Sequence, residues 1–215
     1  KTAVFSPSAG PFKKKIFNII RKKTLQYPDL ISTRDEISFN ELTTLTSRKD
    51  ILLASDSAFL LLNRKGMNSV KPRDTRYRVS VSIGRHNNYD VEKYINVIRL
   101  LLVDIYKEKN AVFYFYPQLY GRYHSDSGFI ADFINTLSFK DRCFIKDFPE
   151  GVERLIESWG DADLGVTTRY HPLIFSVMNT IPFIAFSYEH KQTAFCRTIG
   201  MKEYCLDISN HRFQG

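Results

Sequence analysis

The sequence predicts an α/β fold with largely parallel sheets, and three observations support this prediction. Short apolar runs that suit buried strands alternate with amphipathic stretches of helical period along the whole 215 residues. The composition, with 43% hydrophobic and 25% charged residues, is that of a globular protein and argues against disorder. No apolar run approaches the length of about 20 residues that a membrane span requires.

The predicted elements follow one another in a regular order. Strands are expected at residues 2–6, 30–33, 51–54, 77–83, 111–116, 142–145, 164–167 and 183–186. Helices are expected at residues 15–26, 91–109, 128–137, 151–158, 172–178 and 191–199, with Gly200 ending the last one. A further helix, with Ser38 as its N-cap, ends near residue 45.

Residues 63–76 lose this periodicity and are rich in Lys, Arg, Gly, Asn and Pro, so they are the best linker candidate. Residues 1–72 then form the closing part of an N-terminal Rossmann-like domain plus the linker, and residues 73–215 a C-terminal Rossmann-like domain. The chain begins at Lys1 and enters a strand at once, without a signal peptide. We therefore expect the natural N-terminus to lie upstream and the N-terminal domain to be incomplete in this chain.

The net charge of +8 is concentrated in the segment from Lys13 to Lys23. We interpret this segment as a solvated loop and helix face; the alternative is contact with an anionic substrate, an anionic lipid or a lipid-linked sugar. Aromatic residues lie inside apolar strands, so nucleic-acid binding is not expected. Cys143, Cys196 and Cys205 have no C-x-x-C spacing, which favours reduced thiols in a cytoplasmic protein.

The stretch from Asp163 to Pro172 is the most informative for chemistry. An apolar strand ends at Thr167, and Pro172 suits a first helical turn, so Arg169 and His171 lie between strand and helix. Ligands bind at this edge of parallel sheets, and a helix N-terminus attracts anions. Arg offers a planar fork to carboxylate or phosphate, and His can hold or release a proton near neutral pH. Alternatively, Arg169 pairs with a core carboxylate such as Asp163, and His171 only caps the helix.

Two other strand ends carry similar residues. Tyr188, His190 and Lys191 follow one strand, and Lys191 opens the last helix, where a cation opposes the helix dipole and so suggests an anionic partner. Arg85 follows another strand. Because neighbouring parallel strands end at one edge, we expect Arg85, Arg169 and Lys191 to cluster there. Alternatively, His190 is an ordinary surface histidine and Arg85 an exposed loop arginine, and neither contacts a ligand.

The order of these motifs resembles the polysaccharide pyruvyl transferase family. Arg169-x-His171, a proline before an apolar strand, and Tyr188-x-x-Lys191 resemble its C-terminal signature. Four earlier pieces agree in order: a Gly-Pro turn at residues 8–12, Arg-Asp-x-x-Ser at 34–38, Asp-x-Ala-Phe at 56–59, and a strand ending in Arg at 80–85. The resemblance extends from residue 8 to about residue 207.

The resemblance implies a GT-B-like fold, with two Rossmann-like domains facing each other across a cleft. It also implies an enzyme that moves a pyruvyl group from phosphoenolpyruvate to a pair of sugar hydroxyls. We expect this enzyme in the cytoplasm, at the inner face of the membrane, where the segment from Lys13 to Lys23 would contact lipid. The acceptor would be a polysaccharide or its lipid-linked precursor and the product a ketal, with no cofactor and no metal. The implied catalytic residues are His171, as an acid, and Arg169, as an anion clamp. The implied donor-binding residues are Arg85, Arg169, Tyr170, His171, Tyr188 and Lys191.

Two other functions are compatible with the sequence. The first is a GT-B-type glycosyltransferase with a nucleotide-sugar donor, which would also bind through the C-terminal domain. The second is a non-catalytic module that binds a sugar or an anion, although the joint presence of Arg169, His171 and Lys191 argues against it. The acceptor contacts are expected largely on the N-terminal domain.

Overall fold

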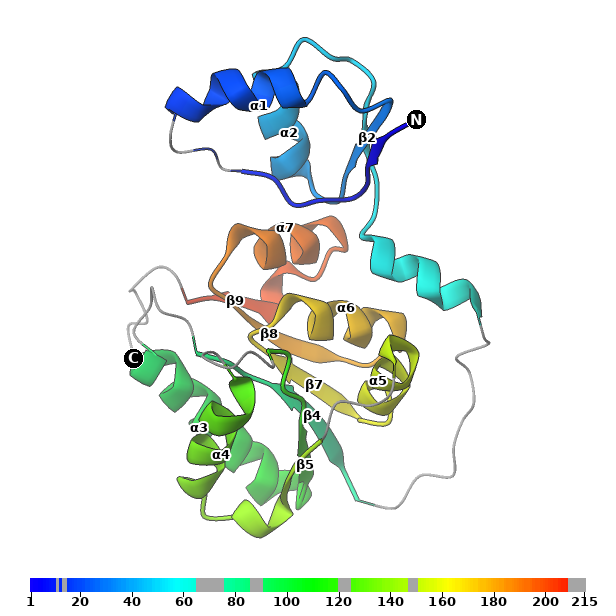
Figure 1. Cartoon of the computed structure of the whole chain (residues 1–215). Helices are drawn as coiled ribbons and strands as arrows, with labels where there is room; N and C mark the ends of the chain where they lie inside the picture. Colours follow the sequence, from blue (N-terminus) through cyan, green and yellow to red (C-terminus); the bar gives the residue numbers. More distant parts are fainter. Residues whose placement is uncertain are drawn as a thin grey trace.

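Two parallel sheets organise the chain in the computed structural model, which describes residues 1–10, 12, 15–64, 76–85, 91–119, 125–146 and 151–208 (Figure 1). The predicted α/β class with parallel sheets is thereby confirmed. The predicted linker at 63–76 lies almost entirely outside the described residues, as does the predicted boundary between residues 72 and 73. The division into two domains therefore stays a prediction.

The first sheet is small and has three parallel strands in the order β1-β2-β3. Its strands are β1 (Ala3–Val4), β2 (Leu30–Thr33) and β3 (Ile51–Leu53), and its helices are α1 (Asn18–Thr24), after the 3-10 turn η1 (Lys15–Phe17), and α2 (Glu36–Leu45). Ile31, Leu42 and Ile51 form its buried core. A 3-10 helix, η2 (Ser57–Arg64), follows β3.

The second sheet has six parallel strands in the order β6-β5-β4-β7-β8-β9. They are β4 (Arg78–Ser82), β5 (Val112–Phe115), β6 (Cys143–Ile145), β7 (Leu164–Thr167), β8 (Phe183–Ser187) and β9 (Cys205–Asp207). The helices are α3 (Val91–Lys109), α4 (Asp126–Asn135), α5 (Val152–Trp159), α6 (Tyr170–Met178) and α7 (His190–Thr198), with 3-10 turns η3 (Lys140–Arg142) and η4 (Lys202–Tyr204). Counted from β4, this is the doubly wound order 3-2-1-4-5-6, which reverses direction between β4 and β7.

The alternation of side chains along β4 shows how the two faces of this sheet are covered. Val79 and Val81 are fully buried in a core with residues of α3 and α4. Ser80 and Ser82 point to the opposite face, where their hydroxyls donate to the backbone oxygens of Trp159 (3.0 Å) and Tyr116 (2.9 Å). Figure 1 shows α3 and α4 on one side of the sheet and α5 and α6 on the other.

Segments from the N-terminal part of the chain pack against the second sheet's helices. The ring of Phe59, in η2, stacks on that of Phe195 in α7, with centroids 6.2 Å apart. Other apolar residues of η2 pack against the core formed by α5, α6 and α7. Helix α2 also contacts α7. Helices α6 and α7 are therefore in contact with residues from the N-terminal part of the chain.

Helix α2 begins earlier than the sequence predicted, because its N-cap is Asp35 and not Ser38. The Asp35 carboxylate accepts hydrogen bonds from the Ser38 backbone N–H at 2.7 Å and from the Ser38 hydroxyl at 2.9 Å. The Ser38 oxygen in turn accepts from the backbone N–H of Ala9 at 2.7 Å. The Arg-Asp-x-x-Ser segment is thus a helix cap that also holds the turn after β1.

Two predictions about surface and thiol chemistry can be compared with the structure. Cys143, Cys196 and Cys205 are free thiols, as predicted. Part of the basic stretch, Lys13 and Lys14, lies outside the described residues. Helix α1 buries no residue, and η1 and α1 expose three large apolar side chains: Ile16 (78%), Ile19 (69%) and Ile20 (63%). Of the helices in the described part, none is long and apolar enough to cross a bilayer.

We predict that Asp35→Ala destabilises α2 by about 1 kcal/mol, because the buried carboxylate caps two donors of Ser38. Amide hydrogen exchange in α2 should then accelerate about five-fold, given the exponential dependence of opening on free energy. Glu36→Ala, which changes the exposed neighbouring acid, is the matched control. Equal exchange in both variants would contradict the cap.

Candidate functional site

The candidate site lies where the strand order of the second sheet reverses. Gly84 and Arg85 follow β4, and Arg169 follows β7, its parallel neighbour, so both segments end at the same edge. In doubly wound folds, ligands bind in the crevice at this edge and at this reversal. Helix α6 begins at Tyr170, two residues before the predicted start, so Arg169 is its N-cap residue and His171 lies in its first turn.

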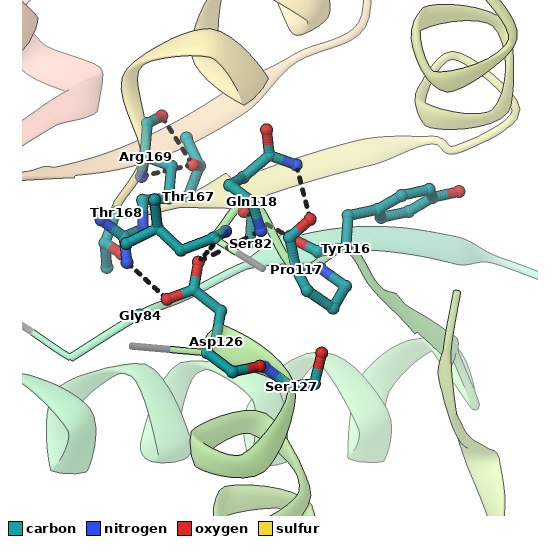
Figure 2. A network of polar contacts seen from close by, with 12 residues as sticks. Ser82, Gly84, Tyr116, Pro117, Gln118, Asp126, Ser127, Thr167, Thr168 and Arg169 are labelled. Atoms are coloured by element: carbon teal, nitrogen blue, oxygen red, sulfur yellow. Dashed lines mark hydrogen bonds and ion pairs between the residues drawn. The ribbon is translucent and has the colours of Figure 1, made fainter. Parts of the chain in front are cut away.

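A buried ion pair between Arg169 and Asp126 dominates this edge. The guanidinium nitrogen Nη2 of Arg169 lies 2.5 Å from Oδ1 of Asp126, and these side chains are only 11% and 3% exposed. The other oxygen, Oδ2, accepts from the backbone N–H groups of Gln118 and Leu119, both at 3.1 Å. Figure 2 shows the two charged groups pointing toward each other beside Gly84. The pair joins the turn after β7 to the first residue of α4.

Arg169 is fixed by its backbone as well as by its side chain. Its N–H donates to the Thr167 hydroxyl oxygen at 2.8 Å, and that hydroxyl donates to the Arg169 carbonyl at 2.9 Å. Burial works against the charge, but Asp126 and a hydrogen bond with Tyr188 outweigh it and raise the pKa of Arg169. Among the described residues, its buried Nε has no hydrogen-bond partner. The guanidinium therefore stays charged, and one of its buried N–H groups has no acceptor among the described residues.

Arg85 belongs to the same group of residues, although it is exposed. Its guanidinium carbon lies 5.9 Å from the centre of the Phe129 ring, and its charge, like that of Arg169, acts on the phenol of Tyr94. Tyr94 donates to the Gly84 carbonyl at 2.6 Å, and burial raises its pKa to about 12. Tyr94 thus stays neutral and ties α3 to the turn that carries Arg85.

Tyr170 lies within a second group, which includes residues from the N-terminal part of the chain. Its buried ring has the Arg34 guanidinium 4.4 Å and the Lys191 ammonium 5.8 Å from its centre. Arg34 also pairs with the nearly buried carboxylate of Asp56 at 2.7 Å. Burial raises the pKa of Tyr170 well above its ordinary value, so the phenol remains neutral. The motif pieces at residues 34–38 and 56–59 therefore meet at the start of α6.

His171 lies close to the same charges and is accessible from solvent. Although the residue as a whole is exposed, the protein atoms around its ring desolvate it and lower the pKa of His171. Asp56 opposes this shift, whereas Arg34 and Lys191 add to it. Because an imidazole is charged only below its pKa, His171 is mostly neutral at pH 7 when no ligand is bound.

The predicted site residues thus fall into two adjacent groups. Around Asp126 lie Arg85, Arg169 and Tyr188; around the Arg34–Asp56 pair lie Tyr170, His171 and Lys191. Lys191 also pairs with Glu189 at 2.8 Å. The carboxylate suggested as an alternative partner of Arg169, Asp163, accepts instead from the backbone N–H of Arg78 at 2.9 Å. Within the described ranges, no group of three His, Cys, Asp or Glu residues could hold a metal ion.

Sequence reasoning missed Asp126 and Gln192. Asp126 is the first residue of α4 after its N-cap Ser125, a position where an acid ordinarily complements the helix dipole, so nothing marked it as a partner for Arg169. Gln192 is fully buried, and its amide donates to the Thr168 carbonyl at 2.8 Å. Its other amide atom, Oε1, has no partner among the described residues. Only a three-dimensional structure brings these residues to the site.

We predict that Gly84→Ala destabilises the second sheet's unit by about 1–3 kcal/mol, the usual range for overpacking. A Cβ at Gly84 would overlap the Asp126 carboxylate and would lie 2.6 Å from Cζ of Arg169. Gly128→Ala is the matched control, because a Cβ there meets nothing within 4 Å. Urea unfolding followed by the fluorescence of Trp159, the one tryptophan of the sequence and buried in this unit, provides the measurement. Equal stability of both variants would contradict the packing described at Gly84.

Solved structures share this fold at low sequence identity. UDP-GlcNAc 2-epimerase from Methanocaldococcus jannaschii matches with a TM-score of 0.61 and 15% identity, over 94% of this chain and 60% of its own. TarM matches with a TM-score of 0.53 and 17% identity, over 86% of this chain and 35% of its own. A variant of TarM from S. aureus, in complex with Fondaparinux, alpha-GlcNAc-glycerol and UDP, matches with a TM-score of 0.54 and 16% identity, over 86% and 36%. The predicted GT-B-like α/β fold is thus confirmed over part of the length of these proteins.

The comparison with protein families is more specific than the comparison of folds. No curated protein matches the chain. The chain spans 60% of the length of the epimerase that it resembles. The family described as polysaccharide pyruvyl transferase matches residues 1–190, a range that includes both groups of site residues except Lys191. From this match over most of its 215 residues, the chain belongs to the polysaccharide pyruvyl transferase family.

Proposed function

We propose that the protein transfers a pyruvyl group from phosphoenolpyruvate to two hydroxyls of a sugar and so forms a ketal. The observation that carries the proposal is the buried Arg169, which Asp126 fixes at the strand reversal with its Nε–H free. This cation stands directly before α6, whose first turn carries His171. An anion-binding fork and a proton-transfer group therefore adjoin each other.

The charges of the site suit the donor. Phosphoenolpyruvate carries a phosphate and a carboxylate, and guanidinium groups bind both in a planar, bidentate manner. Asp126 holds Nη2 of the Arg169 guanidinium, and the buried Nε–H, which has no acceptor among the described residues, is the donor group that we assign to the ligand. Arg85 is exposed nearby, and the N-terminus of α6 adds backbone N–H groups that favour an anion. We assign donor binding to Arg85, Arg169, Tyr170, His171, Tyr188 and Lys191.

The proposed reaction is balanced without any change of oxidation state. His171, protonated once the donor is bound, gives a proton to the methylene carbon of the enol, and the first sugar hydroxyl attacks the resulting cationic carbon and loses its own proton. Phosphate then leaves with both electrons of its C–O bond, and the second hydroxyl attacks the same carbon and releases a proton. The products are the ketal and inorganic phosphate. The fixed cation at Arg169 stabilises the charge of the departing phosphate.

The exposed apolar and basic side chains of η1 and α1 support a further part of this proposal. Ile16, Ile19 and Ile20 are exposed, and Lys22 and Lys23 follow in the last turn of α1. Apolar and cationic side chains together favour the interface of an anionic bilayer. We infer that the enzyme is cytoplasmic and works at the inner face of the membrane, where a lipid-linked acceptor would be presented.

We predict that Arg169→Lys weakens binding of phosphoenolpyruvate at least ten-fold, because a lysine ammonium cannot keep the planar geometry that pairs with Asp126 and at the same time presents Nε–H to the donor. His171→Gln should leave donor affinity within a few-fold and lower turnover by about 10²–10⁴, the share usual for general acid catalysis. Calorimetry and release of phosphate by the full-length protein provide the measurements. Labelled phosphoenolpyruvate and UDP-sugars, offered in parallel, distinguish this function from glycosyl transfer. Use of the UDP-sugars alone would overturn the proposal.

We also predict a pH dependence that separates the free enzyme from the donor complex. The pKa of His171 is lowered in the free protein, so its acid form is lost at a lower pH than for an ordinary histidine. A bound phosphate favours the imidazolium and raises that pKa. Therefore kcat/KM should begin to fall at a lower pH than kcat. Identical falling limbs, or falling limbs that persist in His171→Gln, would contradict the acid role.

A further inference from the structure

A separate hollow of about 280 Å³ opens beside the turn that follows β8. It lies at the carboxyl ends of β8 and β9, whose last residues, Ser187 and Asp207, are register partners. Helix α7 forms one side, and Ile37 of α2 contributes from the N-terminal part of the chain. Its lining residues are Ile37, Ser187, Glu189, His190, Thr193, Ala194, Arg197 and Asp207. The volume is at the lower end of the range for small-molecule sites.

The charges that line this hollow differ from those around Arg169. The charged and titratable residues of the lining are two carboxylates, Glu189 and Asp207, together with Arg197 and His190. With two carboxylates and one guanidinium, the lining lacks the excess of positive charge that a trianionic donor such as phosphoenolpyruvate requires. It suits a neutral ligand with several hydroxyls, because carboxylates accept strong hydrogen bonds from O–H groups.

The hydroxyl groups that line the hollow are hydrogen-bonded to their neighbours, and one ring nitrogen of the lining lacks a partner among the described residues. The Ser187 hydroxyl donates to the Glu189 carbonyl at 2.7 Å, and the Thr193 hydroxyl lies 3.0 Å from the Ser187 oxygen. The ring nitrogen Nε2 of His190 is buried and, among the described residues, has no hydrogen-bond partner. A buried polar atom without a partner is costly and is ordinarily satisfied by water or by a ligand. Ile37 and Ala194 add apolar surface for the C–H face of a ring.

The residues from Ser187 to Lys191 are divided between the hollow and the donor residues. Ser187, Glu189 and His190 line the hollow, whereas Tyr188 is hydrogen-bonded to Arg169 and Lys191 lies over the ring of Tyr170. The salt bridge of 2.8 Å between Lys191 and Glu189 connects the two sides. A ligand in the hollow is thus separated from the donor residues by the thickness of one turn.

We propose that this hollow is a subsite for a neutral sugar ring of the acceptor, a proposal that rests on the transfer to sugar hydroxyls proposed above. The carboxylates of Glu189 and Asp207 and the Nε2 atom of His190 bind ring hydroxyls, and Ile37 faces the apolar side of the ring. The acceptor is then recognised partly by the second sheet's unit and not by the N-terminal domain alone, in contrast to the expectation from sequence.

Binding of methyl glycosides of glucose, galactose, mannose and N-acetylglucosamine to the full-length protein tests the subsite, with saturation-transfer NMR as the measurement. Ala194→Phe should fill the hollow and weaken glycoside binding at least ten-fold. Thr198→Phe, one turn further along α7 and not among the lining residues, is the matched control. Asp207→Asn should also weaken binding, whereas Glu203→Gln, which changes an exposed acid of η4, should not. Calorimetry with phosphoenolpyruvate is run on the same variants.

Loss of glycoside binding in Ala194→Phe and Asp207→Asn, with donor affinity kept within a few-fold, supports the subsite. The subsite is overturned if the wild-type protein binds none of the glycosides, or if these two variants bind them as well as their controls do. It is also overturned if both variants lose phosphoenolpyruvate binding, since the hollow would then belong to the donor site. If the wild-type protein binds glycosides in this hollow but turns over no phosphoenolpyruvate, the sugar site stands and the proposed reaction falls.

Discussion

The buried ion pair of Arg169 and Asp126 is the constraint on which the rest of the site depends. Burying two charges is costly, and such a pair is tolerated only where its remaining donors and acceptors are satisfied. Asp126 meets this condition through two backbone N–H groups, and Arg169 meets it in part through Tyr188. The Nε of Arg169 is the one buried atom of the pair that lacks a partner among the described residues. An anion that accepted this N–H, as proposed for the donor, would complete the hydrogen bonds of the pair.

The residues around the Arg34–Asp56 pair connect the N-terminal part of the chain to the start of α6. Arg34 comes from the end of β2, yet it contacts the ring of Tyr170 and pairs with Asp56 just before η2. These contacts fix the first residue of α6, which follows Arg169 directly. A change in how the N-terminal sheet sits on α6 and α7 would therefore alter the charges that act on His171. A ligand that moved the two parts relative to each other would thereby change the pKa of His171.

The sequence was sufficient for elements with a strong hydrophobic period and insufficient for contacts made at a distance. The strands at 30–33 and 164–167 and the helix at 91–109 have the predicted bounds, because apolar runs and a 3.6-residue period set them locally. Strand β9 was not predicted, since its three half-exposed residues carry no alternation that could be recognised. Ser38 was expected as the N-cap of α2, but the N-cap is Asp35. Both residue types favour that position, and only the backbone conformation distinguishes them.

For the site, the positions of Arg85, Arg169 and Tyr188 at one sheet edge follow from strand order, which a sequence read as doubly wound already implies. The roles of Asp126 and Gln192 do not follow from it, because their partners lie 43 and 24 residues away along the chain. Lys191 pairs with Glu189 and lies over the ring of Tyr170, two contacts that helix and strand patterns do not encode.

The side chains around the turn after β8 are divided between the hollow and the residues beside Arg169, and this division limits how the turn can change. Tyr188 and Lys191 contact Arg169 and Tyr170, whereas Glu189 and His190 line the hollow. Neighbouring positions of the turn therefore face different places. If the hollow binds the acceptor as proposed, substitution at 189 or 190 would change acceptor preference without touching Arg169 or His171. Insertion or deletion of one residue in this turn would instead move side chains from each set to the other place. Both sets of contacts therefore depend on the length of the turn as well as on its residues.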